Sequence, residues 1–153
     1  MSAAAAYSEL AGRLADASGD VIRRYFRNLP DVSDKVDASP VTIADQQAEE
    51  VMRALLEIDC PDHGILGEEG ENVRQDADYL WVLDPIDGTK NFASGSYQFG
   101  TLISLLMDGA PILGIINQPV LAERWFGLAG ETTTFNGQPI KTRACSTLAD
   151  AWM

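Results

Sequence analysis

The sequence predicts an α+β fold in one domain, with two amphipathic helices followed by a largely antiparallel sheet. Segments with helical periodicity fill the first third of the chain, and short strand-like apolar runs follow residue 63. Asp108-Gly109 is a hairpin-turn signal between two of these runs, and Asn136-Gly137 is a second turn signal. Helices first and hairpin-joined strands afterwards are typical of α+β domains. A chain of 153 residues is long enough to bury a core.

Two helices are expected at the start of the chain. The first covers residues 5–27, where apolar side chains recur every three or four positions. A polar loop is expected over 28–40, and the second helix over 43–58. Thr42 and Asp45 have the spacing of a capping box at the start of the second helix. Asp45 therefore has a structural explanation that competes evenly with a functional one.

Five strands are expected after the helices. They are predicted at Gly64–Gly67 and over 79–83, 99–107, 112–117 and 124–128. Among the aromatic side chains, Trp81 and Trp125 are interpreted as core residues, and His63 as a surface residue.

The charge balance limits the partners of this protein. Eleven Lys and Arg residues face 23 Asp and Glu residues, which gives a net charge of −12. Binding to nucleic acid or to an anionic membrane surface is disfavoured, because both need basic side chains to meet phosphates. An anionic ligand would need another source of positive charge, and a bound metal ion is the obvious candidate.

Cysteine and histidine are too few for several common kinds of site. Cys60 and Cys145 form no disulfide framework, and His63 is the single histidine. A Cys/His zinc site is close to excluded, and a Ser-His-Asp hydrolase is excluded unless His63 serves it. We see no membrane-spanning run, secretory signal or transit peptide. We expect a soluble intracellular protein of the cytoplasm or, after removal of a transit peptide, of the plastid stroma.

Acidic residues gather between Asp62 and Asp87, where eight of them accompany one basic residue, Arg74. Two groups, Glu68-Glu69 and Asp84 with Asp87, come just after short apolar strands. Carboxylates at the ends of buried strands are costly unless something pairs them, and a divalent hard cation would do so. Taken alone, Glu68-Glu69 is better explained as a solvated loop, but the downstream acids reverse that preference.

The string Asp84-Pro85-Ile86-Asp87-Gly88-Thr89 carries the strongest chemical signal. An apolar strand delivers Asp84, Pro85 bends the chain, and Asp87 can return to the same side. Gly88 permits close backbone approach, and Thr89 can begin a short helix whose N–H groups face an anion. Such a turn can hold Mg²⁺ with oxygen ligands and a phosphate with amides, whereas an isolated Asp-Pro or Asp-Gly pair is nearly always a plain polar turn.

This string, together with Gly67-Glu68-Glu69 and Thr42-x-x-Asp45 upstream, resembles the inositol monophosphatase superfamily of Mg²⁺-dependent phosphomonoesterases. The segments 99–105, 114–120 and 123–125 resemble its histidinol-phosphatase branch, plant and algal type. Asn91 departs from that branch, which often has Ser there. The resemblance implies a layered α/β sandwich, of which this chain is the N-terminal portion. We therefore expect a single truncated domain over 1–153, with the C-terminal part of the fold missing.

The resemblance also implies residue roles. Glu68 and Asp84, with the carbonyl of Ile86, would hold a first Mg²⁺, and Asp84 and Asp87 would share a second. Glu68, Thr89 and Asp45 form the implied catalytic group, in which Thr89, linked to Asp45, would orient and help to deprotonate the attacking water. The implied phosphate-binding residues are Asp87, Gly88 and Thr89.

The leading hypothesis is therefore hydrolysis of a small phosphate monoester, most simply L-histidinol phosphate in histidine biosynthesis. The alternatives are an inositol monophosphatase, a truncated chain that binds metal without catalysis, and a purely structural domain. A family Trp-Asp motif that completes the second metal site is not found. Because an incomplete sheet would expose apolar surface, we expect poor solubility, homodimerisation or weak activity.

Overall fold

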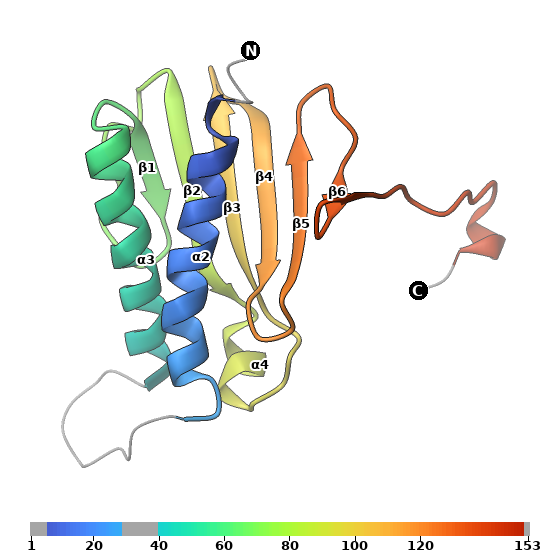
Figure 1. Ribbon diagram of the computed structural model, residues 1–153, viewed down its shortest axis with the longest axis horizontal. Coiled ribbons are helices and arrows are strands. Elements are labelled where there is room, and N and C mark those ends of the chain that lie inside the picture. The colour runs from blue at the N-terminus through green and yellow to red at the C-terminus, as the bar shows by residue number, and fades with distance from the viewer. Residues whose placement is uncertain (1–5, 29–39, 152–153) are drawn as a thin grey trace.

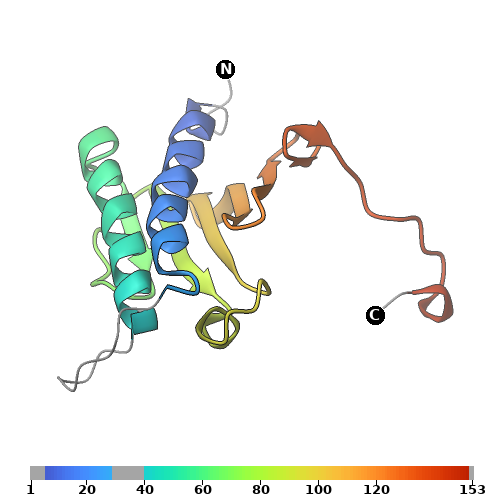
Figure 2. The same cartoon turned by 60° about the horizontal axis from the view of Figure 1, so that its bottom comes forward.

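Two helices cover one face of a single sheet. The computed structural model describes residues 6–28 and 40–151, with the backbone alone for 40–42. Helices α2 (Ser8–Tyr25) and α3 (Pro40–Asp59) lie side by side on this face, and the short helix α4 (Thr89–Ala93) lies at one end of the sheet (Figure 1). Figure 2 shows the same layering from a second direction. The predicted α+β architecture is confirmed.

The sheet has seven strands whose spatial order follows the chain. Strand β1 is parallel to β2, and every later pair is antiparallel. Both turn signals, Asp108-Gly109 and Asn136-Gly137, are confirmed, because the two residues of each have positive φ, as a type I′ turn requires. The strands are β1 (Gly64–Gly67), β2 (Tyr79–Asp87), β3 (Gly100–Met107), β4 (Ala110–Gln118), β5 (Glu123–Leu128), β6 (Thr134–Phe135) and β7 (Gln138–Pro139).

Several boundaries differ from the sequence prediction. Helix α3 begins at Pro40, so Thr42 lies inside its first turn and the expected capping box is wrong. Proline suits this first position, since its missing N–H would be unpaired there in any case. Strand β2 continues through Asp87 instead of ending at residue 83, and the hairpin strands β6 and β7 were not predicted. Most of the expected loop, residues 29–39, lies outside the described residues.

Two apolar clusters lie between the helices and the sheet. The larger joins α2 and α3 to the centre of the sheet through side chains such as Leu14, Met52 and Leu105, none of which is exposed. The smaller lies at the α4 end, where Ile86 and Phe92 meet Ile22 from α2. Each buried side chain of this size contributes about 1.5–3 kcal/mol, so the smaller cluster anchors the end of β2 firmly.

Trp81 and Trp125 differ in burial. Trp81 is completely buried, as predicted, whereas the interpretation of Trp125 as a core residue is wrong. Trp125 lies in register with Ile116 and Leu102 on the sheet face opposite the helices, and Ile116 is 51% exposed there. No helix in the described ranges, 6–28 and 40–151, covers this face (Figure 2). The same ranges contain no helix with the length and apolar character that crossing a membrane requires.

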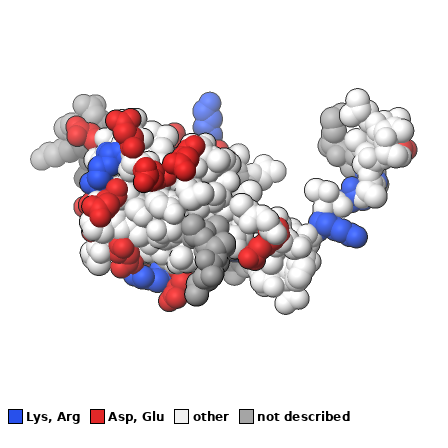
Figure 3. All heavy atoms as spheres, turned by 90° about the horizontal axis from the view of Figure 1, so that it is seen from above, with Lys and Arg blue, Asp and Glu red and all other residues white. Residues whose placement is uncertain are grey.

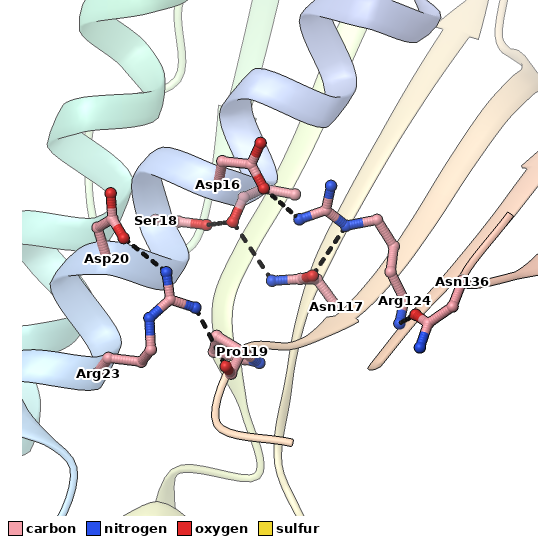
Figure 4. A network of polar contacts seen from close by, with 9 residues as sticks. Asp16, Ser18, Asp20, Arg23, Asn117, Pro119, Arg124 and Asn136 are labelled. Atoms are coloured by element: carbon pink, nitrogen blue, oxygen red, sulfur yellow. Dashed lines mark hydrogen bonds and ion pairs between the residues drawn. The ribbon is translucent and has the colours of Figure 1, made fainter. Parts of the chain in front are cut away.

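A polar network fixes α2 to the sheet (Figure 4). The guanidinium of Arg124 donates to Asp16 on α2 at 2.7 Å and to the amide oxygen of Asn117 at 2.9 Å. Asn117, which is 4% exposed, donates in turn to the carbonyl oxygen of Ala15 at 3.3 Å. Because a buried amide without partners would be costly, this network specifies how the helix sits on β4.

The single histidine lies in an aromatic cluster, so its interpretation as a surface residue is wrong. His63 is half-buried, stacks on Tyr79 with 4.9 Å between ring centroids, and meets Tyr7 edge-on. The indole N–H of Trp81 donates to its Nδ1 at 3.1 Å. An acceptor at Nδ1 is a neutral imidazole, because imidazolium carries protons on both nitrogens.

Burial lowers the pKa of His63 from its ordinary value of 6.5, and Arg74 lowers it further while Asp62 opposes the shift. The neutral ring therefore stabilises the fold fully above pH 6.5, and that stabilisation is lost as the pH falls through the lower folded-state pKa. We therefore expect the difference in free energy of unfolding between the wild type and His63→Gln, which keeps an acceptor for Trp81, to fall as the pH drops through this window, because all other titrating groups are common to the two proteins. Urea unfolding at several pH values measures both; an unchanged pH profile in the variant would contradict the assignment.

Candidate metal and phosphate site

The parallel pairing of β1 and β2 brings two carboxylates together. Gly67 is the register partner of Leu83, so the next residues along, Glu68 and Asp84, lie beside each other at the same sheet edge. The two carboxyl groups lie so close that Glu68, after burial itself, is the main cause of the raised pKa of Asp84. The predicted association of these two acids is therefore observed, and it follows from strand register.

A β-bulge brings Asp87 round to the same side. Asp84 is paired with Leu102 and Asp87 with Gly100, so three steps along β2 correspond to two steps along β3. Without the extra residue, side chains three positions apart would point to opposite faces of the sheet. The bulge cancels that alternation, and Asp87 is among the charges that raise the pKa of Asp84.

The bulged residues are anchored from both sides. The hydroxyl of Thr101, itself fully buried, donates to the carbonyl oxygen of Pro85 at 2.8 Å. The side chain of Ile86 is inaccessible in the smaller core cluster, whereas its carbonyl oxygen accepts a hydrogen bond from the Thr89 hydroxyl at 3.2 Å. Burial of the Ile86 side chain thus holds its carbonyl in a fixed position next to the carboxylates.

Gly88 forms the turn from β2 into α4. Its φ of +93° lies in a region that other residues avoid, and a Cβ there would come within 2.8 Å of the Gln98 carbonyl oxygen. The main-chain bonds that close the first turn of α4 are donated by Asn91 and Phe92 to the carbonyl oxygen of Gly88. The amide of Thr89 precedes these donors, so it belongs to the N-terminal N–H groups that the helix does not use.

Asp45 faces the same acids from α3. Its side chain is 3% exposed, although it lies in the helix interior and caps nothing. Burial, followed by the charges of Glu69, Asp84, Glu68 and Glu49, raises its pKa to about 7. Its predicted partner Thr89 donates its hydroxyl proton to Ile86 instead. The structure thus brings Asp45 to the acidic group and assigns the Thr89 hydrogen bond elsewhere.

Charge crowding is the electrostatic signature of the site. Burial and the neighbouring Glu68 raise the pKa of Asp84 to about 7, and burial with Glu68 and Glu49 raises that of Glu69. Among the charged side chains on the face seen in Figure 3, the acidic ones also predominate on the body of the protein. Raised carboxyl pKa values from like charges in a half-buried site are typical of functional centres.

The residues present fit a hard divalent cation. One carboxylate oxygen of Asp45 and one of Asp84 are buried and have no hydrogen-bond partner among the described residues. A cation beside Asp84 would give such an oxygen a partner and relieve the crowding, since Mg²⁺ prefers oxygen ligands. Within 6–28 and 40–151, no three acidic, histidine or cysteine side chains are close enough to hold an ion as they stand. Two carboxylates and the Ile86 carbonyl are therefore the donor set that the structure offers.

Sequence reasoning missed Glu49. This residue is 1% exposed, and its carboxylate accepts the main-chain N–H groups of Glu69 and Gly70 at 2.8 and 2.9 Å. An acidic residue in an amphipathic helix is normally assigned to the solvent face. The available signal was its spacing of four from Asp45, which places both acids on one side of α3, together with buried Ala48 next to Glu49.

Two larger cavities lie next to the acidic group or away from it. A groove of about 650 Å³ crosses the sheet face opposite the helices and has Asp84 among its lining residues, with Ile116 and Trp125. A cavity of about 640 Å³ lies between α2 and the β4–β6 region, where Arg124 and Asp16 form the ion pair of Figure 4. The charges of that pair are satisfied by each other, so the pair offers no free charge to a ligand in the second cavity.

The family of the protein follows from this arrangement and from comparison with known proteins. A family model described as the inositol monophosphatase family matches residues 5–153. The chain belongs to the inositol monophosphatase family. Proteins of this family are hydrolytic phosphatases that depend on metal, generally Mg²⁺. The resemblance stated from the sequence motifs is thereby confirmed.

Relatives in the family have different names. The chain is 54% identical to bifunctional phosphatase IMPL2, chloroplastic, of Arabidopsis thaliana, over 96% of this chain and 43% of that protein. It is 38% identical to a histidinol-phosphatase of Chlorobaculum parvum, over 89% of this chain and 53% of that protein. The structure of an inositol monophosphatase from Zymomonas mobilis matches with a TM-score of 0.85 and 52% identity, over 95% of this chain and 56% of that one. The chain thus spans about half the length of the relatives that it matches.

Removing one of the crowded carboxylates should stabilise the metal-free chain. At pH 8, Asp84→Asn removes the negative charge that lies beside Glu68, so we expect the free energy of unfolding to rise by about 1 kcal/mol. The gain is limited because the site is half exposed and water screens the repulsion. Urea unfolding in EDTA measures the change, with Asp76→Asn as a control that removes an exposed loop charge. Destabilisation by Asp84→Asn beyond that of the control would contradict this account.

Proposed function

We propose that this protein is a Mg²⁺-dependent phosphomonoesterase acting on a small phosphate monoester. The observation that carries the proposal is the Glu68–Asp84 contact, with a buried Asp84 oxygen that lacks a hydrogen-bond partner among the described residues. Carboxylates held this close are costly without a cation, and family membership supplies the reaction class.

The chain supplies oxygen ligands from three elements. Glu68 at the end of β1, Asp84 on β2 and the carbonyl of Ile86 in the bulge would hold a first Mg²⁺, and Asp84 with Asp87 would share a second. When bound, Mg²⁺ supplies positive charge against the phosphate and lowers the pKa of a water molecule. The anchored bulge gives the ligand carbonyl its position before the ion arrives, which reduces the cost of assembling the site.

The remaining residues orient water and phosphate. The Thr89 hydroxyl lies at the start of α4 next to the Ile86 carbonyl, where it can position an attacking water. Asp45 is buried beside the same acids, and one of its carboxylate oxygens has no partner among the described residues, so it can accept a hydrogen bond or a proton from a water held there. Asp87, Gly88 and Thr89 would contact the phosphate. Gly88 and Thr89 would do so through their main-chain N–H groups at the N-terminal end of α4.

Among substrates, we favour L-histidinol phosphate, with myo-inositol monophosphate as the alternative. The support is the set of names among the relatives, which includes a histidinol-phosphatase and a bifunctional phosphatase, together with the segment resemblances in 99–105 and 114–120. The Arabidopsis relative is named as chloroplastic, which supports the plastid stroma as a location beside the cytoplasm. The similarity to the structure of an inositol monophosphatase supports myo-inositol monophosphate as the alternative substrate, so both substrates are tested.

Phosphate release from both substrates tests the function. We expect Mg²⁺-dependent release from L-histidinol phosphate at a higher kcat/KM than from myo-inositol 1-phosphate, and its abolition by EDTA. Glu68→Gln and Asp84→Asn should each lower kcat/KM by about 100-fold or more, because each removes a direct metal ligand.

The control for these variants is Asp76→Asn, which removes one exposed charge from the loop before β2. It should retain activity within about twofold, as a surface change away from the site. Equal losses in all three variants would show that total charge, and not the proposed site, determines activity. Calorimetric Mg²⁺ binding without any turnover would instead support the non-catalytic alternative, in which the chain binds metal alone.

Direct attack by water makes a stereochemical prediction. Because the proposed site contains no residue assigned as a covalent nucleophile, phosphorus should be attacked once and its configuration should invert. Hydrolysis of a chiral, isotopically labelled phosphate ester in labelled water reports the outcome. Retention would require an even number of displacements and would exclude the single-step mechanism.

A further inference from the structure

We propose that Glu49 is a positioning residue that fixes the metal-ligand loop after β1 and thereby sets the affinity for Mg²⁺. The inference rests on the proposed function, because it concerns the placement of Glu68. Glu49 itself lies behind the loop on α3, and its carboxylate is occupied by main-chain and arginine donors. It therefore acts through Glu68 and not as a ligand.

The carboxylate of Glu49 holds both of the residues that follow Glu68. Oε2 accepts the N–H of Glu69 at 2.8 Å, and Oε1 accepts the N–H of Gly70 at 2.9 Å. Hydrogen bonds from main-chain amides to an ionised acceptor are about twice as strong as neutral ones. Because the carboxylate is 1% exposed, water cannot readily replace it as the acceptor. The loop is thus fixed immediately after the proposed ligand.

Arg53 also restrains the loop after β1, through Glu49 and through a direct hydrogen bond. It lies one turn along α3, and its Nε donates to Glu49 Oε1 at 2.7 Å. Its Nη1 donates to the carbonyl oxygen of Glu71 at 2.9 Å, which extends the restraint to the far side of the loop. The ion pair also balances the charge of Glu49, so this buried carboxylate can lie near the acidic site without adding a full negative charge to it.

The residue before Glu68 is restrained by space. A Cβ on Gly67 would lie 2.2 Å from Glu49 Oε1. The main chain therefore passes so close to the carboxylate that only glycine fits at this position. Glu68 therefore lies between Gly67, packed onto Glu49, and Glu69, bonded to it. With both neighbours held, the direction of the Glu68 side chain toward Asp84 is fixed by a residue that would never touch the ion.

Mg²⁺ titration calorimetry of the 153-residue chain tests the proposal. Glu49→Ala should weaken Mg²⁺ binding by about tenfold or more, the usual effect of losing a group that orients a metal ligand. Glu49→Gln, which keeps one carbonyl acceptor, should recover part of the affinity. Amide hydrogen exchange at Gly70, measured without metal, should accelerate in the same order.

Two matched controls separate positioning from charge and from stability. Glu50→Gln removes the same charge from the neighbouring, exposed position and should leave Mg²⁺ affinity within about twofold. Met52→Ala opens the core below α3 and should lower the melting temperature without changing the affinity, when titrated well below that temperature. Where Glu49→Ala does not fold, Glu49→Gln carries the test.

The outcomes decide between the claims. Weakened binding by Glu50→Gln to the same degree would overturn positioning in favour of charge, and faster Gly70 exchange with unchanged Mg²⁺ affinity would leave Glu49 a purely structural role. Normal binding and normal exchange in Glu49→Gln and Glu49→Ala would overturn the inference while leaving the proposed function intact. Asp84→Asn provides the reference for lost Mg²⁺ binding. If the wild-type chain binds Mg²⁺ no better than this variant, both the positioning role of Glu49 and the proposed function are overturned.

Discussion

Repulsion between carboxylates that the backbone forces together is the constraint on which this structure depends. Parallel register sets Glu68 beside Asp84, and one extra residue in β2 turns Asp87 toward them. Neither feature improves packing, because a bulge interrupts the ladder and each added charge raises the cost of the next. A fold that retains such an arrangement concentrates negative potential at one point, which is the condition for selecting a small, highly charged cation.

The rest of the fold can be understood as the frame that withstands this repulsion. The smaller apolar cluster buries Ile86 and so holds the bulge from inside, while the Thr101 hydroxyl satisfies the carbonyl that the bulge exposes. On the other side, α3 presses Asp45 and Glu49 against the acidic strand ends. Local strain and charge at a site are sustained where surrounding contacts determine the geometry more strongly than the site itself does.

The sequence was sufficient for the two helices, the β3–β4 hairpin and the acids at strand ends, because each depends on local periodicity or turn chemistry. The features that depend on tertiary contacts were predicted wrongly or were missed. The capping-box explanation of Asp45 failed because the helix begins earlier, at Pro40. Trp125 was assigned to the core because tryptophan is usually buried, but one face of its strand is open in the described part of the chain. Glu49 was overlooked because its partners are main-chain amides, and no pattern of residue types in the sequence predicts such contacts.

The charge balance links these features to the chemistry. A phosphate ester approaching this site meets carboxylates first, and the nearby Arg53 is already engaged by Glu49 and by the loop carbonyl of Glu71. The guanidinium of Arg53 is thus used to build the loop and not to receive the anion. Main-chain amides at the start of α4 are weak partial charges and cannot offset several carboxylates by themselves. We therefore expect a cation to bind before the anion at this place, and metal and phosphate each to raise the affinity for the other.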